Sequence, residues 1–147
     1  MPMNLQKDLR EFVELLNALN VRFLVVGAFA VAHHGYPRYT SDIDLFLENS
    51  AENADQLIKA IDQFGFGGVG LTKEDFLQKD QVVQLGVAPN RIDLMTFISG
   101  VGFEEAWASR EMGQIGDLSV PFISKEMLKR NKMASGRSQD LADLERL

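Results

Sequence analysis

The stretch that decides the fold is Ser41-Asp42-Ile43-Asp44-Leu45-Phe46-Leu47, an apolar segment that carries two aspartates. Its branched and aromatic residues favour a β-strand, predicted over residues 40–48, whereas aspartate is normally depleted from strands. Because successive strand side chains alternate between faces, Asp42 and Asp44 project to the same face, about 6.6 Å apart along the strand. Two carboxylates so close repel each other unless a cation or a proton intervenes. The segment therefore predicts a divalent-cation site, with Mg²⁺ the common ion beside phosphates.

A third aspartate, Asp93, occupies a similar apolar segment, residues 91–98, which predicts a second strand. If the two strands are neighbours, three carboxylates converge and could hold one or two Mg²⁺ ions, about 3.5–4 Å apart if two, as in phosphoryl transfer. The alternatives are that Asp42 is a cap, Asp44 a solubility device on an edge strand and Asp93 a turn residue. Neutralisation of these carboxylates by a lysine or arginine would argue against catalysis.

The remaining segments predict an α+β fold, a small mixed β-sheet flanked by helices with a C-terminal helical tail. Apolar residues at helical spacing, with Ser50 and Ser124 as caps, favour helices. We expect one domain over residues 1–147, with a core of about 1–123 and a tail of about 124–147. The predicted helices cover residues 5–19, 28–34, 51–64, 103–111, 124–134 and 137–147; the other predicted strands are 21–27 and 83–87, and a hairpin surrounds Gly116-Asp117.

A glycine junction follows the first predicted strand, at Gly27-Ala28. A helix that begins directly after a strand presents free backbone N–H groups to an anion, and glycine lets a phosphate approach the backbone closely. Arg38 and Thr40 lie between this junction and the carboxylates, where they could contact phosphate or simply be surface residues. The junction alone is a weak signal, since glycine is common in such connections.

Composition excludes several function classes. The chain of 147 residues has no cysteine, so it has neither disulfides nor cysteine nucleophiles. Its 15 basic and 21 acidic residues give a net charge of −6, which disfavours non-specific nucleic-acid binding. The longest apolar run, residues 23–32, is too short for a membrane span, and without a leader sequence we expect a cytoplasmic protein. His33 and His34 are adjacent and would point about 100° apart on a helix, so we do not expect them to share a metal.

The segment from Val25 to Leu45 resembles the polymerase-β-like nucleotidyltransferase superfamily, through its glycine, arginine, threonine and paired aspartates at matching spacings. Within that superfamily it is most similar to small bacterial proteins related to AbiEii-type abortive-infection toxins. The resemblance extends to the strand of Asp93 and to the tail. There a lysine, a Gly-Arg pair and two aspartates match a family motif: Lys132, Gly136-Arg137, Asp140 and Asp143.

The resemblance implies a Mg²⁺-dependent transfer of a nucleoside monophosphate from a nucleoside triphosphate to a hydroxyl acceptor (RNA, protein or small molecule), with a cognate antitoxin as a further partner. It implies that Asp42 and Asp44 hold Mg²⁺ while the Gly27-Ala28 backbone grips the outer phosphates. Further implied roles are a second metal and acceptor deprotonation for Asp93, charge neutralisation for Lys132, and shaping of the site wall for Arg137 or Asp140. Two alternatives stay open: an inactive nucleotide-binding or protein-interaction module, and a phosphohydrolase with water as acceptor.

Overall fold

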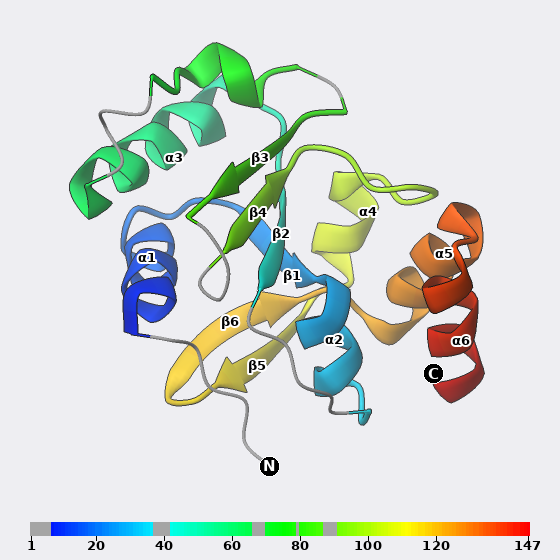
Figure 1. Cartoon of the computed structure of the whole chain (residues 1–147). Helices are drawn as coiled ribbons and strands as arrows, with labels where there is room; N and C mark the ends of the chain where they lie inside the picture. Colours follow the sequence, from blue (N-terminus) through cyan, green and yellow to red (C-terminus); the bar gives the residue numbers. More distant parts are fainter. Residues whose placement is uncertain (1–6, 37–41, 66–69, 79, 87–90) are drawn as a thin grey trace.

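A six-stranded mixed sheet forms the centre of the computed structural model, which describes residues 7–36, 42–65, 70–78, 80–86 and 91–147 (Figure 1). Its order is β3-β4-β2-β1-β6-β5. Neighbours β1 and β6, and β2 and β4, are parallel, whereas the pairs β1–β2, β3–β4 and β5–β6 are antiparallel. The predicted mixed α+β fold is confirmed. The strands are β1 (Phe23–Val26), β2 (Ile43–Leu47), β3 (Val82–Leu85), β4 (Ile92–Met95), β5 (Glu111–Ile115) and β6 (Leu118–Phe122).

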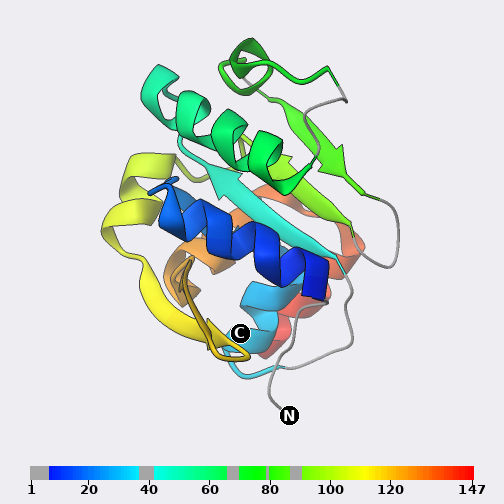
Figure 2. The same cartoon turned by 90° about the vertical axis from the view of Figure 1, so that its left-hand side faces the viewer.

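Helices cover the sheet on both sides. Helices α1 (Lys7–Ala18) and α3 (Ala51–Phe64) lie side by side over one face, which Figure 2 shows from the front. On the opposite side α5 (Lys125–Ser135) and α6 (Ser138–Arg146) form a pair, and α2 (Gly27–His33) and α4 (Phe103–Ala108) also lie on this side in Figure 1. A short 3-10 turn, η2 (Lys73–Phe76), falls in a segment for which the sequence predicted no structure. No helix in the described part of the chain is long and apolar enough to cross a membrane.

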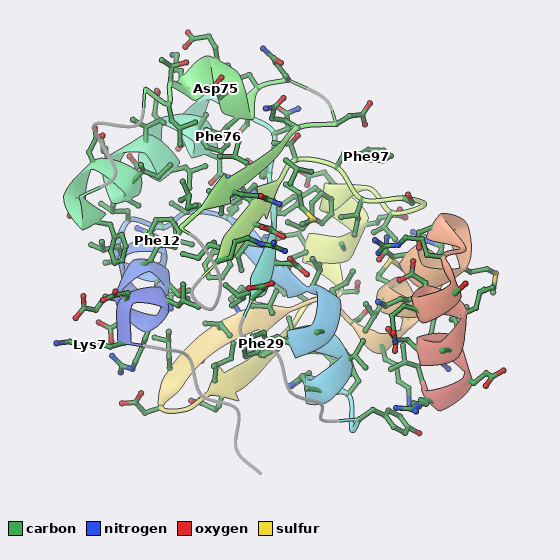
Figure 3. The ribbon with its side chains drawn as sticks, in the orientation of Figure 1. Lys7, Phe12, Phe29, Asp75, Phe76 and Phe97 are labelled. Carbon is green, nitrogen blue, oxygen red and sulfur yellow. The ribbon has the colours of Figure 1, made fainter. Side chains whose placement is uncertain are left out.

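The core lies between the central strands and these helices. All four residues of β1 are buried, because β1 sits inside the sheet with both faces covered. The amphipathic stripes of α1 and α3 point into the same core, with Phe12, Leu16, Leu57 and Ile61 all buried. Figure 3 shows Phe12 on the α1 side of the sheet and Phe97 on the opposite side.

Two predicted caps are confirmed. Ser50 Oγ accepts the backbone N–H of Asn53 at the start of α3, and Ser124 Oγ accepts that of Met127 at the start of α5. Two helices differ from the prediction. Helix α4 ends at Ala108 because Glu111 already pairs in β5. In α6 the buried positions are aspartates, whereas Leu141 is half exposed, because a buried lysine lies opposite them.

Candidate active site

Asp44 and Asp93 stand directly opposite each other on the adjacent parallel strands β2 and β4. The condition on which convergence of the aspartates depended, that these two strands are neighbours, is therefore met. Strand β2 lies between β4 and β1, so Asp44 is not an edge-strand residue, and Asp93 is buried within β4 instead of in a turn. Those two alternatives were wrong. Asp42 immediately precedes β2 and lines the same cavity as the other two aspartates.

This cavity has a volume of about 690 Å³ and opens between the sheet and α5. Its walls come from the β1–α2 junction, the start of β2, β4 with the loop after it, and the C-terminal half of α5. Negative and positive side chains face each other across it. The charged residues that line it are Asp42, Asp44, Arg91, Asp93, Lys132 and Arg137.

Gly27 brings the backbone of the β1–α2 junction against the Asp44 carboxylate. Its φ of +67° lies in the left-handed region, and a Cβ at this position would stand 2.1 Å from Asp44 Oδ2. Both the conformation and the close approach require glycine. The predicted glycine junction thus lies directly against Asp44, one of the three predicted metal ligands.

The surroundings of Asp44 disfavour the ionised form of its carboxylate. The pKa of Asp44 is raised to about 7, and burial is the largest cause. The charge of Asp93, a hydrogen bond with Asp93 and the charge of Asp42 raise it further, whereas the charge of Arg91 lowers it. Burial and the neighbouring carboxylates both disfavour the ionised form of Asp44, and a divalent cation would favour that form.

Arg91 is the neighbour that the sequence did not predict. Its Nη2 lies 3.2 Å from Asp42 Oδ2, and its Nε lies 3.1 Å from Asp93 Oδ1. Neutralisation by an arginine is the observation that the sequence analysis set against catalysis, and the Arg91 guanidinium, just before β4, reaches two of the three carboxylates. The only signal in the sequence was the alternation Arg91-Ile-Asp93, which places both side chains on one face.

Arg91 does not satisfy all the polar atoms of this cluster, and the carboxylate oxygens are ligands that suit a hard cation. Asp93 Oδ1 and Arg91 Nε are buried, yet neither makes a hydrogen bond in the part of the chain that the structure describes. Among these four side chains one guanidinium contacts two of three carboxylates, so the cluster itself has more acidic than basic groups. A buried carboxylate oxygen without a hydrogen bond, beside two more carboxylates, matches the oxygen ligands that Mg²⁺ takes.

Lys132 is held by acids of the last helix. Its Nζ lies 3.2 Å from Asp140 Oδ1 and 3.1 Å from Asp143 Oδ2, and all three side chains are buried. Asp140 also accepts hydrogen bonds from Ser135 Oγ at 2.6 Å and Arg137 Nε at 2.7 Å. Although burial alone would raise the pKa of Asp140, these donors lower it well below its usual range. The α5–α6 connection is thereby fixed around one ionised carboxylate.

The remaining predicted residues fall into three groups. Arg137 lines the cavity with its side chain 77% exposed, so it can reach a ligand. Asp140 lies behind that wall and supports Arg137 and Lys132, while Ala28 follows Gly27 in α2 and is half-buried. Arg38 and Thr40 lie outside the described residues.

The sequence patterns also did not predict that an aromatic ring, Phe97, lies at the cavity. Phe97 follows β4, lines the cavity and is 51% exposed, as its outward position in Figure 3 also shows. Its segment was expected to continue the strand as core, but β4 ends at Met95. An exposed ring beside a charged cavity offers a stacking surface for a planar group such as a nucleobase.

The sequence matches no protein-family model and no curated protein. Two solved structures share the fold. A candidate nucleotidyltransferase from Thermotoga maritima superposes with a TM-score of 0.60 at 16% identity, over 94% of this chain and 88% of that one. The lincosamide antibiotic adenylyltransferase LnuA, in its lincomycin-bound form, superposes with a TM-score of 0.56 at 18% identity, over 97% of this chain and 96% of its own.

Proposed function

We propose that this chain, which has the fold of the nucleotidyltransferase superfamily, transfers a nucleoside monophosphate from a nucleoside triphosphate to a hydroxyl group. The observation that carries the proposal is the register of Asp44 with Asp93, which puts two carboxylates side by side with Asp42 in one cavity and against Gly27. Aspartates in neighbouring inner strands are costly unless they serve a purpose.

Asp42, Asp44 and Asp93 are the residues that would hold Mg²⁺. When bound, the ion would neutralise charge on the triphosphate and on the attacking and leaving oxygens. The chain's own groups then act around the nucleotide. Gly27 leaves room for the Asp44 carboxylate beside the backbone, and Arg137 offers an exposed guanidinium to phosphate oxygens.

The reaction follows from that placement. The acceptor hydroxyl attacks the α-phosphate, a new P–O bond forms, and pyrophosphate leaves with the electron pair of the broken bond. Asp93, whose buried Oδ1 makes no hydrogen bond among the described residues, would accept the proton that the hydroxyl loses. Lys132 contributes positive charge from the cavity wall, held by Asp140 and Asp143.

Among the acceptors that the resemblance allows, we favour a small molecule. LnuA is an antibiotic adenylyltransferase captured with lincomycin, and this chain matches 96% of it. The likeness therefore requires no additional acceptor-binding domain. An AbiEii-type toxin role with a cognate antitoxin, and a cytoplasmic location, stay predictions from sequence.

Incubation with each of the four α-labelled ribonucleoside triphosphates, Mg²⁺ and small hydroxyl compounds tests the function. We expect label to transfer to an acceptor and pyrophosphate to appear, and Asp44→Asn to lower the rate at least a thousandfold. Asp62→Asn, an exposed aspartate of α3, is the matched control and should keep wild-type activity. Release of labelled monophosphate without a labelled acceptor would indicate hydrolysis instead.

One observation favours a second candidate, a nucleotide-binding module without transfer. Arg91 balances part of the negative charge of the aspartates without any ion. Calorimetry separates the two candidates. A nucleoside triphosphate that binds with Mg²⁺ but yields neither labelled acceptor nor pyrophosphate supports the module and contradicts the transferase.

A further inference from the structure

A second cluster of ligating side chains lies away from the aspartate cavity. It consists of His33 at the end of α2, His34 at its C-cap and Glu111 at the start of β5. These are the only two histidines in the chain. One ligand atom from each residue lies within 4.8 Å of the other two, and none of the three residues lines the cavity.

The expectation that the two histidines would point apart was wrong. His34 is the C-cap of α2, with its N–H still bonded to the carbonyl of Ala30 but with a non-helical ψ of 17°. The two rings therefore meet edge to face, with centroids 4.9 Å apart. The separation of about 100° applies only to consecutive residues inside a regular helix.

The ring of His33 is fixed against the sheet. It stacks on Phe122 of β6 with centroids 4.0 Å apart and planes 10° apart. Phe122 pairs with Glu111 across the β5–β6 ladder, so the stacking brings His33 beside that carboxylate. Gly113 makes room for the ring, since a Cβ there would stand 2.6 Å from His33 Cε1.

The ring of His34 is oriented by a backbone carbonyl. Its Nε2 lies 2.8 Å from the carbonyl oxygen of Ile123. A carbonyl oxygen can only accept, so Nε2 carries the hydrogen and Nδ1 keeps the free lone pair. An imidazole whose other nitrogen donates to a backbone carbonyl is the arrangement that orients histidine ligands in metal sites.

We propose that His33, His34 and Glu111 form a binding site for a divalent transition-metal ion, with Zn²⁺ the best match to two nitrogens and one carboxylate oxygen. Three protein ligands would leave the fourth tetrahedral position to water. Tetrahedral ligands at Zn²⁺ stand about 3.4 Å apart, given Zn–N bonds of about 2.0–2.1 Å. Glu111 is exposed, so its side chain can rotate inward to close the site.

The location suggests what such an ion would do. Strand β5 is the edge of the sheet, and α2 starts at Gly27 beside Asp44. An ion shared by α2 and β5 would tie the end of that helix to the sheet edge. This role does not depend on the proposed transfer activity.

Tag-free protein labelled with ¹⁵N is titrated with Zn²⁺ in excess Mg²⁺, which is added to compete with Zn²⁺ at the aspartate cavity. Because the chain has only these two histidines, their ring nitrogens report on the cluster alone. We expect one equivalent of Zn²⁺ to shift Nδ1 of His34 and one nitrogen of His33, and to raise the melting temperature. Asp44→Asn should leave both effects in place.

Three variants sharpen the test. Glu111→Gln should weaken Zn²⁺ binding at least tenfold, whereas Glu52→Gln, an exposed glutamate of α3, should not. Gly113→Ala removes no ligand and has no left-handed backbone to strain, yet it should weaken binding by displacing His33. Unshifted ring nitrogens at stoichiometric Zn²⁺, or wild-type affinity in Glu111→Gln, would overturn the proposal.

Discussion

Asp44 and Asp93 are in-register partners on two parallel strands, and the Asp44 carboxylate lies against the backbone of Gly27. This arrangement joins three segments that are far apart in the sequence. It also concentrates negative charge where the sheet is otherwise apolar, with Ile43, Leu45 and Leu94 fully buried beside it. This concentration of carboxylates in one cavity is what supports the proposed cation site.

The first prediction concerns pH. The pKa of Asp44 is raised to about 7 in the folded chain, above its ordinary value of 3.8. The folded state therefore holds this proton more tightly than the unfolded state, so the contribution of Asp44 to stability is full below pH 3.8 and is lost as pH rises through 7. Each unit of such a shift corresponds to about 1.4 kcal/mol.

Thermal unfolding without metal checks this expectation. From pH 5 to pH 8.5 the wild type should lose more stability than Asp44→Asn, which has no carboxylate to deprotonate, and Mg²⁺ should stabilise the wild type more at the higher pH. Asp62→Asn serves as the control and should follow the wild type. Equal pH slopes in wild type and Asp44→Asn would contradict the assigned cause.

Gly27→Ala is the second prediction. The new Cβ would meet Asp44 Oδ2 and would also sit on a left-handed backbone, φ +67°. Gly35→Ala is a matched control, because Gly35 also has a positive φ, +109°, but nothing within 4 Å of a new Cβ. The left-handed backbone alone should cost both variants about 1–2 kcal/mol of unfolding free energy, and the contact with Asp44 should make Gly27→Ala lose more than Gly35→Ala. Only Gly27→Ala should also lose Mg²⁺ binding and transfer activity, measured by calorimetry and by the labelling assay.

Local sequence patterns accounted for most of the fold. Ser50 and Ser124 marked two helix starts, and the alternation around Asp44 and Asp93 marked two strands. These signals depend on neighbours along the chain. The pairing of β2 with β4 was only a condition in the sequence analysis, because nothing local specifies which strands become neighbours.

Contacts between residues far apart in the sequence could not be predicted from these local patterns. Arg91 reaches Asp42 only because β4 lies beside β2, and Phe97 reaches the cavity only because β4 ends two residues before it. His33 and His34 were misplaced for a different reason. The helix ends between them, and helix ends are the least predictable feature of a sequence.

Arg91→Gln is the third prediction. The guanidinium stands where a cation would, 3.1 Å from Asp93 Oδ1 and 3.2 Å from Asp42 Oδ2, so it competes with Mg²⁺. Its removal should raise the Mg²⁺ affinity of the nucleotide-free protein about threefold to tenfold, equivalent to about 0.7–1.4 kcal/mol. Isothermal calorimetry measures the change. Arg110→Gln removes the same charge from a residue stacked on Trp107, and it should leave the affinity unchanged. Weaker Mg²⁺ binding in Arg91→Gln would show that Arg91 supports the ion site.

The fourth prediction separates a structural role of Lys132 from a catalytic one. Its ammonium is buried between Asp140 and Asp143, so Lys132→Met leaves two buried carboxylates without their shared cation. Breaking a buried pair in this way costs about 3–5 kcal/mol, whereas Lys129→Met, on the exposed side of the same helix, should change stability by less than about 0.5 kcal/mol. Urea unfolding measures both. Lys132→Arg keeps the charge, so it should be more stable than Lys132→Met. If Lys132→Met unfolds like the wild type but transfers no nucleotide, the lysine acts on the substrate and the aspartates do not depend on it for their burial.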